Sequence, residues 1–159
     1  MSELKNKVVW ITGASSGIGQ ALAFAMAKEG AKLVLSSRRD QELKKVAEKC
    51  SSDVLIIPLD LSNSSNFKDL TQQVLEHFGS IDVLINNGGI SQRSEAAQTS
   101  LEVDRKLMEV NYFGAAALTK AVLPIMQQQK SGHLVAISSL SGKFGFFLRS
   151  AYSASKFAL

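Results

Sequence analysis

Five short apolar runs alternate with helical segments along this chain, and no hairpin signal joins any two of them. The runs cover residues 8–11, 33–35, 54–57, 83–85 and 134–137, and the helical patterns cover 18–28, 40–49, 63–78 and 101–129. Consecutive strands without hairpins require crossover connections, which are almost always right-handed. The pattern predicts an α/β fold with a doubly wound, Rossmann-like parallel sheet in the order 3-2-1-4-5. Its ligand crevice should lie at the carboxyl ends of strands 1 and 4, where the order reverses.

The sequence also predicts where some of these elements begin and end. Asp40 is expected to be the N-cap of the second helix, and Gly79 is expected to end the third. Pro124 lies inside the fourth helical segment, so a kink or an early end is possible there. The last run, 134–137, has the composition of a buried parallel strand, and it would present Ser139 at its carboxyl end.

The length and composition of the chain are those of one globular domain. With 159 residues, 45% of them hydrophobic and 20% charged, it can bury one core, so a single domain over residues 1–159 is expected. No apolar stretch approaches the length of a membrane span, and the first residues lack a signal-peptide core. The net charge of +4 is modest, and the lone Cys50 cannot form an internal disulfide. We therefore expect a cytoplasmic protein without a metal site that binds neither membranes nor nucleic acid.

A glycine-rich turn follows the first run and opens the first helix. It contains Gly13, Ser15, Ser16, Gly17, Ile18 and Gly19. Gly13 permits a tight turn, Gly17 lets a pyrophosphate approach the backbone, and Gly19 lets helix and strand pack closely. The spacing G-x-x-x-G-x-G departs from the common G-x-G-x-x-G, and the turn lacks the lysine of a P-loop, which argues against ATP chemistry. The alternative is a glycine turn that serves packing alone.

The second run ends in two serines and two arginines, where an NAD-binding protein would carry an acidic residue. Ser37, Arg38 and Arg39 would attract the 2′-phosphate of NADP(H) through charge-assisted hydrogen bonds, whereas a carboxylate would repel it. NADP(H) is therefore favoured over NAD, unless the arginines only solvate a loop. After the third run, Asp60 and Leu61 would contact the adenine edge, although an aspartate there is equally well explained as a turn former.

Two asparagine-containing segments complete the expected cofactor edge. The fourth run leads into Asn87, Gly88 and Gly89, whose glycines permit the close approach of a ribose and whose asparagine can brace neighbouring backbone. Asn111 lies within the long helical segment, where asparagine is a poor helix former. One explanation is a displaced helical turn whose carbonyl binds a water. An asparagine that hydrogen-bonds to a nearby strand is about equally consistent with its position.

The end of the chain carries a candidate catalytic group. Tyr152 and Lys156 are four residues apart, so in a helix they lie on one face, one above the other. A neighbouring cation favours phenolate over phenol, which suits a tyrosine that passes a proton near neutral pH. Ser139 would join them from the end of the last strand. Taken alone, a tyrosine and a lysine at this spacing are more often a packed ring and a solvated cation.

The chain resembles the short-chain dehydrogenase/reductase family in the combination and order of five features. These are the TGxxxGIG turn, the NNxG strand end, the helix asparagine, the serine and the YxxxK pair. The resemblance extends from about Lys7 to the end of the chain. The segment 87–94 is similar to the member-seven branch of that family. Glycine at position 88, where the usual pattern NNAG has alanine, should be a mild departure because it only loosens the backbone.

The resemblance implies a role for each member of the catalytic group. Tyr152 would be the acid/base, Lys156 would favour its phenolate and hold the nicotinamide ribose, Ser139 would polarise the substrate carbonyl, and Asn111 would anchor a water in the proton relay. The implied reaction is hydride transfer between NADP(H) and a small carbonyl or alcohol substrate. Family members usually form homodimers or homotetramers, so a homo-oligomer is expected.

Family members also continue well past the position of Leu159, with two more strands and a substrate-binding loop. The chain is therefore interpreted as part of a longer enzyme, incomplete at its C-terminus, and inactivity of this piece alone would not be surprising. Tyr152 and Lys156 would then sit on a frayed terminal turn, and the fifth strand would be an uncovered apolar edge.

Two other functions fit part of the sequence. A non-catalytic NADP(H)-binding or sensing module would need only the glycine turn and the arginines, and it would make the catalytic group a coincidence. A sugar-nucleotide epimerase would share YxxxK, but it would need a larger substrate domain and a different glycine spacing.

Overall fold

The strands form one parallel sheet, and the order predicted from the sequence is confirmed. The computed structural model describes residues 3–159. Its strands are β1 (Val8–Thr12), β2 (Lys32–Ser36), β3 (Val54–Ile56), β4 (Val83–Asn86) and β5 (His133–Ala136). They pair in the order β3-β2-β1-β4-β5, with all neighbours parallel. The order reverses between β1 and β4, so the carboxyl ends of these two strands form the crevice edge.

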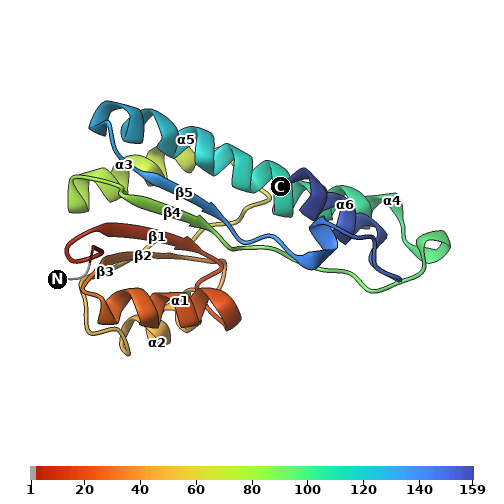
Figure 1. The fold of residues 1–159 in the computed structure, drawn as a ribbon, viewed down its shortest axis with the longest axis horizontal. Helices are drawn as coiled ribbons and strands as arrows, with labels where there is room; N and C mark the ends of the chain where they lie inside the picture. Colours follow the sequence, from red (N-terminus) through yellow and green to blue (C-terminus); the bar gives the residue numbers. More distant parts are fainter. Residues whose placement is uncertain (1–2) are drawn as a thin grey trace.

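Helices cover both faces of this sheet (Figure 1). They are α1 (Gly17–Lys28), α2 (Asp40–Ala47), α3 (Phe67–Phe78), α4 (Leu101–Met108), α5 (Gly114–Gln129) and α6 (Ser150–Ala158). Short helical segments are η1 (Ala96–Gln98), η2 (Glu109–Phe113) and η3 (Leu140–Gly142). In the figure α1 and α2 lie on one face, α3 and α5 lie on the other, and α4 and α6 extend beyond the carboxyl edge of the sheet. None of the helices between residues 3 and 159 is long and apolar enough to span a bilayer.

Two layers of buried side chains hold this arrangement, one on each face of the sheet. Successive side chains of a strand point to opposite faces. Val8 and Trp10 of β1 accordingly pack with the side chains of α3 and α5, whereas Val9 and Ile11 pack with those of α1 and α2. All five residues of β1 are buried, which explains why this strand reads as a continuous apolar run.

Several element boundaries differ from the prediction. Asp40 is the first residue of α2, with Arg39 at the N-cap position, so the prediction of an Asp40 N-cap was wrong. Its carboxylate instead pairs with Lys44 one turn later, at 2.6 Å. The third helix begins at Phe67 and not at 63, because the side chain of Asn63 accepts hydrogen bonds from the amide and hydroxyl of Ser65. Such side-chain turns compete with helix formation.

The long helical segment is interrupted but not at its proline. The π-helical turn η2 separates α4 from α5, and α5 continues through Pro124 to Gln129. A π turn inserts one extra residue per turn and is common at functional sites. Gly79 ends α3 with a left-handed conformation, φ 80°, as predicted.

The two last elements differ most from expectation. The four residues of β5 are all exposed, with Leu134 44% accessible, so the prediction of a buried strand was wrong and the expected apolar edge is present. The prediction of a frayed turn around Tyr152 and Lys156 was also wrong. Both belong to α6, a regular helix of nine residues in which Lys156 is only 7% exposed. Packing against η3 and α4 holds this helix in place.

Candidate functional site

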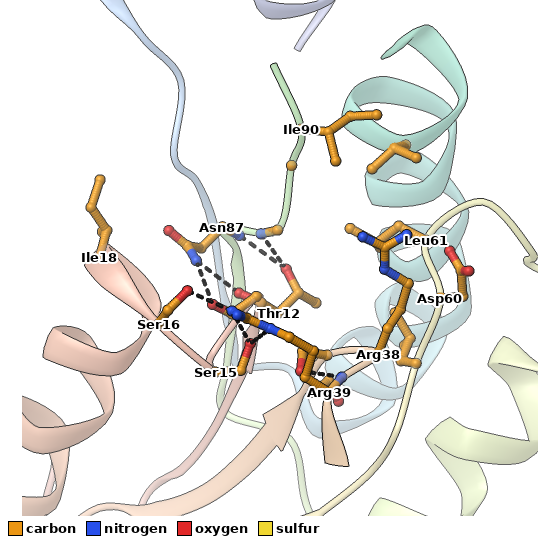
Figure 2. Close-up of a pocket in the computed structure, with 17 residues that line it drawn as sticks. Thr12, Ser15, Ser16, Ile18, Arg38, Arg39, Asp60, Leu61, Asn87 and Ile90 are labelled. Carbon is orange, nitrogen blue, oxygen red and sulfur yellow. Dashed lines mark hydrogen bonds between the residues drawn. The ribbon is translucent and has the colours of Figure 1, made fainter. Parts of the chain in front are cut away.

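The predicted crevice is a cavity at the carboxyl ends of β1, β2 and β4. It encloses about 350 Å³. Twelve of the predicted cofactor residues line it: Gly13, Ser15, Ser16, Ile18, Ser37, Arg38, Arg39, Asp60, Leu61, Asn87, Gly88 and Gly89. Figure 2 shows them converging from four separate segments of the chain. The remaining predicted cofactor residues are Gly17 and Gly19 of the turn, and Tyr152 and Lys156 of α6.

The three glycines of the turn have three different geometries. Gly13 has φ +65°, and a Cβ there would lie 2.8 Å from the Cα of Gly88. A Cβ on Gly19 would lie 2.4 Å from the carbonyl oxygen of Gly13, so close packing of helix and turn requires glycine. Gly17 has φ +56°, but a Cβ there would meet no atom within 4 Å. Open space beside this backbone, at the start of α1, is where a pyrophosphate fits.

The two arginines after β2 are placed differently. Arg39 turns toward the glycine turn, where its Nη2 donates to Ser15 Oγ at 2.9 Å and to Ser16 Oγ at 2.7 Å (Figure 2). Arg38 lies on the opposite side of the cavity, beside Asp60. Neither guanidinium belongs to an ion pair among residues 3–159.

Asp60 is a turn former that also faces the cavity. Its carboxylate accepts hydrogen bonds from the amide and the hydroxyl of Ser62, at 2.9 Å and 2.7 Å. These two bonds, with a smaller contribution from the charge of Arg38, hold the pKa of the Asp60 carboxyl below its usual value. The turn explanation is therefore confirmed, and the contact with adenine stays a prediction for a residue that lines the cavity.

Asn87 connects the end of β4 to the end of β1. Its side-chain Nδ2 donates to the carbonyl of Thr12 at 2.9 Å and to that of Gly13 at 3.3 Å. Thr12 Oγ1 in turn accepts from the amides of Asn87 and Gly88. The bracing predicted for the asparagine is thus present. A Cβ on Gly88 would lie 2.7 Å from Cδ1 of Leu61, so glycine here lets the Leu61 side chain pack over the strand end.

Asn111 is fully buried within the π turn η2 and joins three segments. Its Oδ1 accepts from the Ile90 amide at 2.8 Å, and its Nδ2 donates to the Ile90 carbonyl at 2.9 Å and to Ser155 Oγ at 2.9 Å. The displaced helical turn is confirmed, and the side chain bonds to the segment that follows β4; the binding of a water by the displaced carbonyl stays a prediction. Asn111 thereby fixes the loop after β4 against α6.

Lys156 lies in the same cluster, with its ammonium turned inward. Its Nζ donates to the Ile137 carbonyl at 2.9 Å, just beyond β5. Burial lowers the pKa of this lysine below its usual value of 10.5. A Cβ on Gly89 would lie 3.8 Å from this Nζ, so the lysine reaches the predicted ribose edge of the crevice.

Tyr152 borders two further cavities next to the predicted crevice. One, of about 200 Å³, is lined by Ile18, Asn87, Gly89, Tyr152 and Lys156 among others, and so continues the cofactor crevice. The other, of about 530 Å³, is lined by Ser139, Tyr152 and six further residues. Ser139 Oγ accepts a hydrogen bond from the Ser141 amide at 3.1 Å. The tyrosine therefore borders both the crevice and a second space that also contains the predicted serine.

Four residues near the site were not identified from the sequence. Ser155 Oγ donates to the Tyr152 carbonyl, and Ser138 Oγ donates to the Lys156 carbonyl. Arg149 Nη1 donates to Ser91 Oγ and to the Gln92 carbonyl, and Gln92 Oε1 accepts from the Tyr152 amide at 3.3 Å. The last contacts join segments that are 57–60 residues apart in the chain, so no local spacing signals them.

The residues present fit a dinucleotide. The serines of the turn and the two arginines form a polar, positively charged edge of the cavity, and the open backbone at Gly17 belongs to the same turn. Together with the smaller cavity beside Lys156, this edge runs from the end of β2 to α6. That length and charge suit an extended, multiply anionic ligand.

Comparison with known proteins agrees with this geometry. The family model "short chain dehydrogenase" matches residues 7–159. The mouse protein "Dehydrogenase/reductase SDR family member 7" is 48% identical over 164 residues, which are 99% of this chain and 48% of that protein. The chain spans about half the length of the curated relatives it matches.

Solved structures show the same fold over nearly the whole chain. A short-chain dehydrogenase from Streptomyces avermitilis is 38% identical, with a TM-score of 0.92, over 100% of this chain and 58% of that one. A metagenomic short-chain oxidoreductase in complex with NADP is 33% identical, with a TM-score of 0.93, over 98% of this chain and 72% of that one. On the strength of its sequence match and its fold, this chain belongs to the short-chain dehydrogenase family.

Proposed function

We propose that this chain carries the cofactor site and the proton-transfer group of an NADP(H)-dependent oxidoreductase acting on carbonyl and alcohol substrates. The observation that supports it best is the position of Tyr152, which borders the crevice on one side and a space lined by Ser139 on the other. A substrate held in that space has its reacting carbon facing the crevice and its oxygen beside two hydroxyl groups. Support for NADP(H) over NAD comes from Arg38 and Arg39, and the metagenomic relative binds NADP.

Each residue of the group has a definite part in the proposal. When bound, NADPH supplies the hydride that a carbonyl carbon accepts. Tyr152 gives its hydroxyl proton to the carbonyl oxygen as negative charge develops there, and the product is an alcohol. Ser139 donates a second hydrogen bond to the same oxygen. Its hydroxyl proton is available because, among residues 3–159, its oxygen only accepts a hydrogen bond, from the Ser141 amide.

Lys156 and Asn111 hold Tyr152 in position and return a proton to its hydroxyl. Among residues 3–159 only one of the three Nζ donors of Lys156 is used, on the Ile137 carbonyl, so the others are free for a ribose hydroxyl and for the proton path to Tyr152. Both Nδ2 donors of Asn111 are occupied, by Ile90 and Ser155, so this residue offers a relay water only acceptor oxygens. In the oxidation direction the same proton moves from the alcohol to Tyr152.

The test replaces the phenol and leaves the ring in place. Tyr152→Phe in the intact protein should lower kcat for NADPH oxidation, assayed with a panel of ketones and quinones, by at least about a hundredfold, the usual contribution of a general acid. The affinity for NADPH, measured by fluorescence titration, should change by less than about twofold, because the ring stays in place and Tyr152 does not line the cavity that contains the glycine turn and the arginines.

The chain offers a matched control in its second tyrosine. Tyr112 lies in η2 and contacts Phe113 edge to face, away from the crevice. Tyr112→Phe should leave turnover within about twofold of the wild type. A Tyr152→Phe protein with undiminished turnover would refute the assignment. Tight NADPH binding without turnover of any carbonyl compound would favour a non-catalytic binding module.

A further inference from the structure

The space on the substrate side of Tyr152 has a distinctive chemical composition. It encloses about 530 Å³, the size of a small-molecule site. Its lining consists of Ser91, Arg93, Ser139, Ser141, Phe146, Phe147, Arg149 and Tyr152. Two of these eight side chains are guanidiniums, two are phenyl rings, and none is a carboxylate. We refer to this space as the arginine cavity.

The positive charges of the arginine cavity are not neutralised by the protein. Neither Arg93 nor Arg149 forms an ion pair with any carboxylate of the described chain. Arg93 is exposed and makes no side-chain hydrogen bond within residues 3–159. Because a guanidinium stays protonated at every physiological pH, both charges are present whenever a substrate enters.

Arg149 is held in a fixed position against the catalytic tyrosine. Its Nη1 donates to Ser91 Oγ and, at 2.9 Å, to the Gln92 carbonyl. Its Cζ lies 5.7 Å from the centre of the Tyr152 ring. Within the described residues, Nε and Nη2 have no partner, so this part of the planar group is free to bind a ligand. A guanidinium anchored through one nitrogen loses little further freedom when it binds an anion.

We infer that the arginine cavity selects substrates in which an anionic group lies a few bonds from the reacting carbonyl, with Arg149 and Arg93 binding that group. This inference rests on the oxidoreductase function proposed above and names its substrate class. The short span between the Arg149 guanidinium and the Tyr152 ring sets the spacing between anion and carbonyl. Phe146 and Phe147 line the same cavity and suit an apolar or aromatic body between the two groups.

The experiment compares an acid with its ester in the intact protein. The two probes are 4-acetylbenzoate and methyl 4-acetylbenzoate, which carry the same ketone and ring. Charge-assisted hydrogen bonds between the arginines and the carboxylate should raise the kcat/KM of the acid at least about tenfold above that of the ester. A third probe, 4-acetylphenyl phosphate, determines whether the cavity prefers a carboxylate or a phosphate. A higher kcat/KM for either anion than for the ester supports the inference.

Substitutions of the arginines should remove this preference. Arg149→Gln and Arg93→Gln should each lower the acid-to-ester ratio of kcat/KM by about fivefold or more. Within residues 3–159 the Arg93 side chain makes no hydrogen bond and no ion pair, so its variant keeps the test valid even if Arg149→Gln fails to fold. Lys143→Gln is the matched control, because Lys143 is an exposed cation on the same connection between β5 and α6 but does not line the cavity. Its acid-to-ester ratio should equal that of the wild type.

The outcomes separate this inference from the proposed function. If the ester and the acid are turned over equally, or if neither arginine variant changes the ratio, the inference is wrong while the oxidoreductase function stands. If neither compound is turned over, the proposed function fails for them, and calorimetric titration decides the inference. The acid should then bind at least about tenfold more tightly than the ester, and equal binding would overturn it.

Discussion

Asn111→Ala tests whether one buried side chain holds the candidate site together. Asn111 is 0% exposed, and its amide makes three hydrogen bonds, two to the backbone of Ile90 and one to Ser155 Oγ. Ile90 follows β4, and Ser155 lies in α6 between Tyr152 and Lys156. Alanine at this position removes all three bonds at once, while the π turn that carries it can persist.

The expected loss of stability follows from the groups left without partners. A buried donor or acceptor that loses its partner costs about 1–3 kcal/mol. Two such groups, the amide and the carbonyl of Ile90, are orphaned, and Ser155 Oγ keeps its bond to the Tyr152 carbonyl. Because Ile90 is only half-buried and water can replace part of the loss, we expect the free energy of unfolding to fall by about 2–4 kcal/mol. For a domain of this size that corresponds to a decrease in Tm of about 4–16 °C.

Urea unfolding followed by circular dichroism measures this difference. The matched control is Asn63→Ala, which removes an exposed asparagine whose Oδ1 also accepts two hydrogen bonds, from the amide and hydroxyl of Ser65. It should cost less than about 1 kcal/mol, because water replaces both bonds. An Asn111→Ala protein within about 0.5 kcal/mol of the wild type would refute the reasoning, since it would show that the three bonds do not stabilise the fold.

Two further predictions concern the turn and the buried lysine. Gly17→Ala should lower the free energy of unfolding by only about 1–2 kcal/mol, which is the cost of a positive φ for alanine. It should weaken NADPH binding by at least about tenfold, because the methyl group occupies the open space beside the backbone. Gly79→Ala is the control, because Gly79 at the end of α3 also has a positive φ and open surroundings. This variant should lose the same stability and keep its affinity for NADPH. Equal NADPH affinities for the two variants would contradict the phosphate site. Burial lowers the pKa of Lys156 in the folded protein. Between that lowered pKa and 10.5 the unfolded chain therefore binds more protons than the folded one. The free energy of unfolding should rise with pH in this window. Lys156→Met should flatten that rise in urea titrations at successive pH values, and an unchanged slope would show that Lys156 is not desolvated.

Local patterns predicted most of the residues that line the crevice. The strand-turn-helix context of Gly13, Gly17 and Gly19 led to three separate roles, and the backbone geometry agrees with each one. The errors arose where a side chain competes with the backbone. Asn63 was expected to begin the third helix, but its side-chain oxygen accepts hydrogen bonds from Ser65, two residues ahead, and the helix begins at Phe67. Propensity and periodicity do not register that competition.

The sequence predicted which residues form the candidate catalytic group, but it did not predict that they would lie on a regular helix. The sequence indicated Ser139, Tyr152 and Lys156, yet the stability of α6 could not be read from its nine residues, because a helix this short depends on tertiary packing. The same is true of Arg149. Its contacts with Ser91 and Gln92 join distant segments, so its place beside Tyr152 had no sequence signal.

The sequence by itself determined the order of the sheet and the edge at which the crevice opens. Crossover handedness and the alternation of apolar runs leave few ways to wind such a chain, and glycines at fixed spacings are needed wherever backbones meet closely. Only the tertiary structure decided which arginine meets the serines of the turn, how Asn111 joins three segments, and that Tyr152 separates a crevice from a cationic cavity. These features depend on distances between residues far apart in the chain, and such distances exist only after the core has packed.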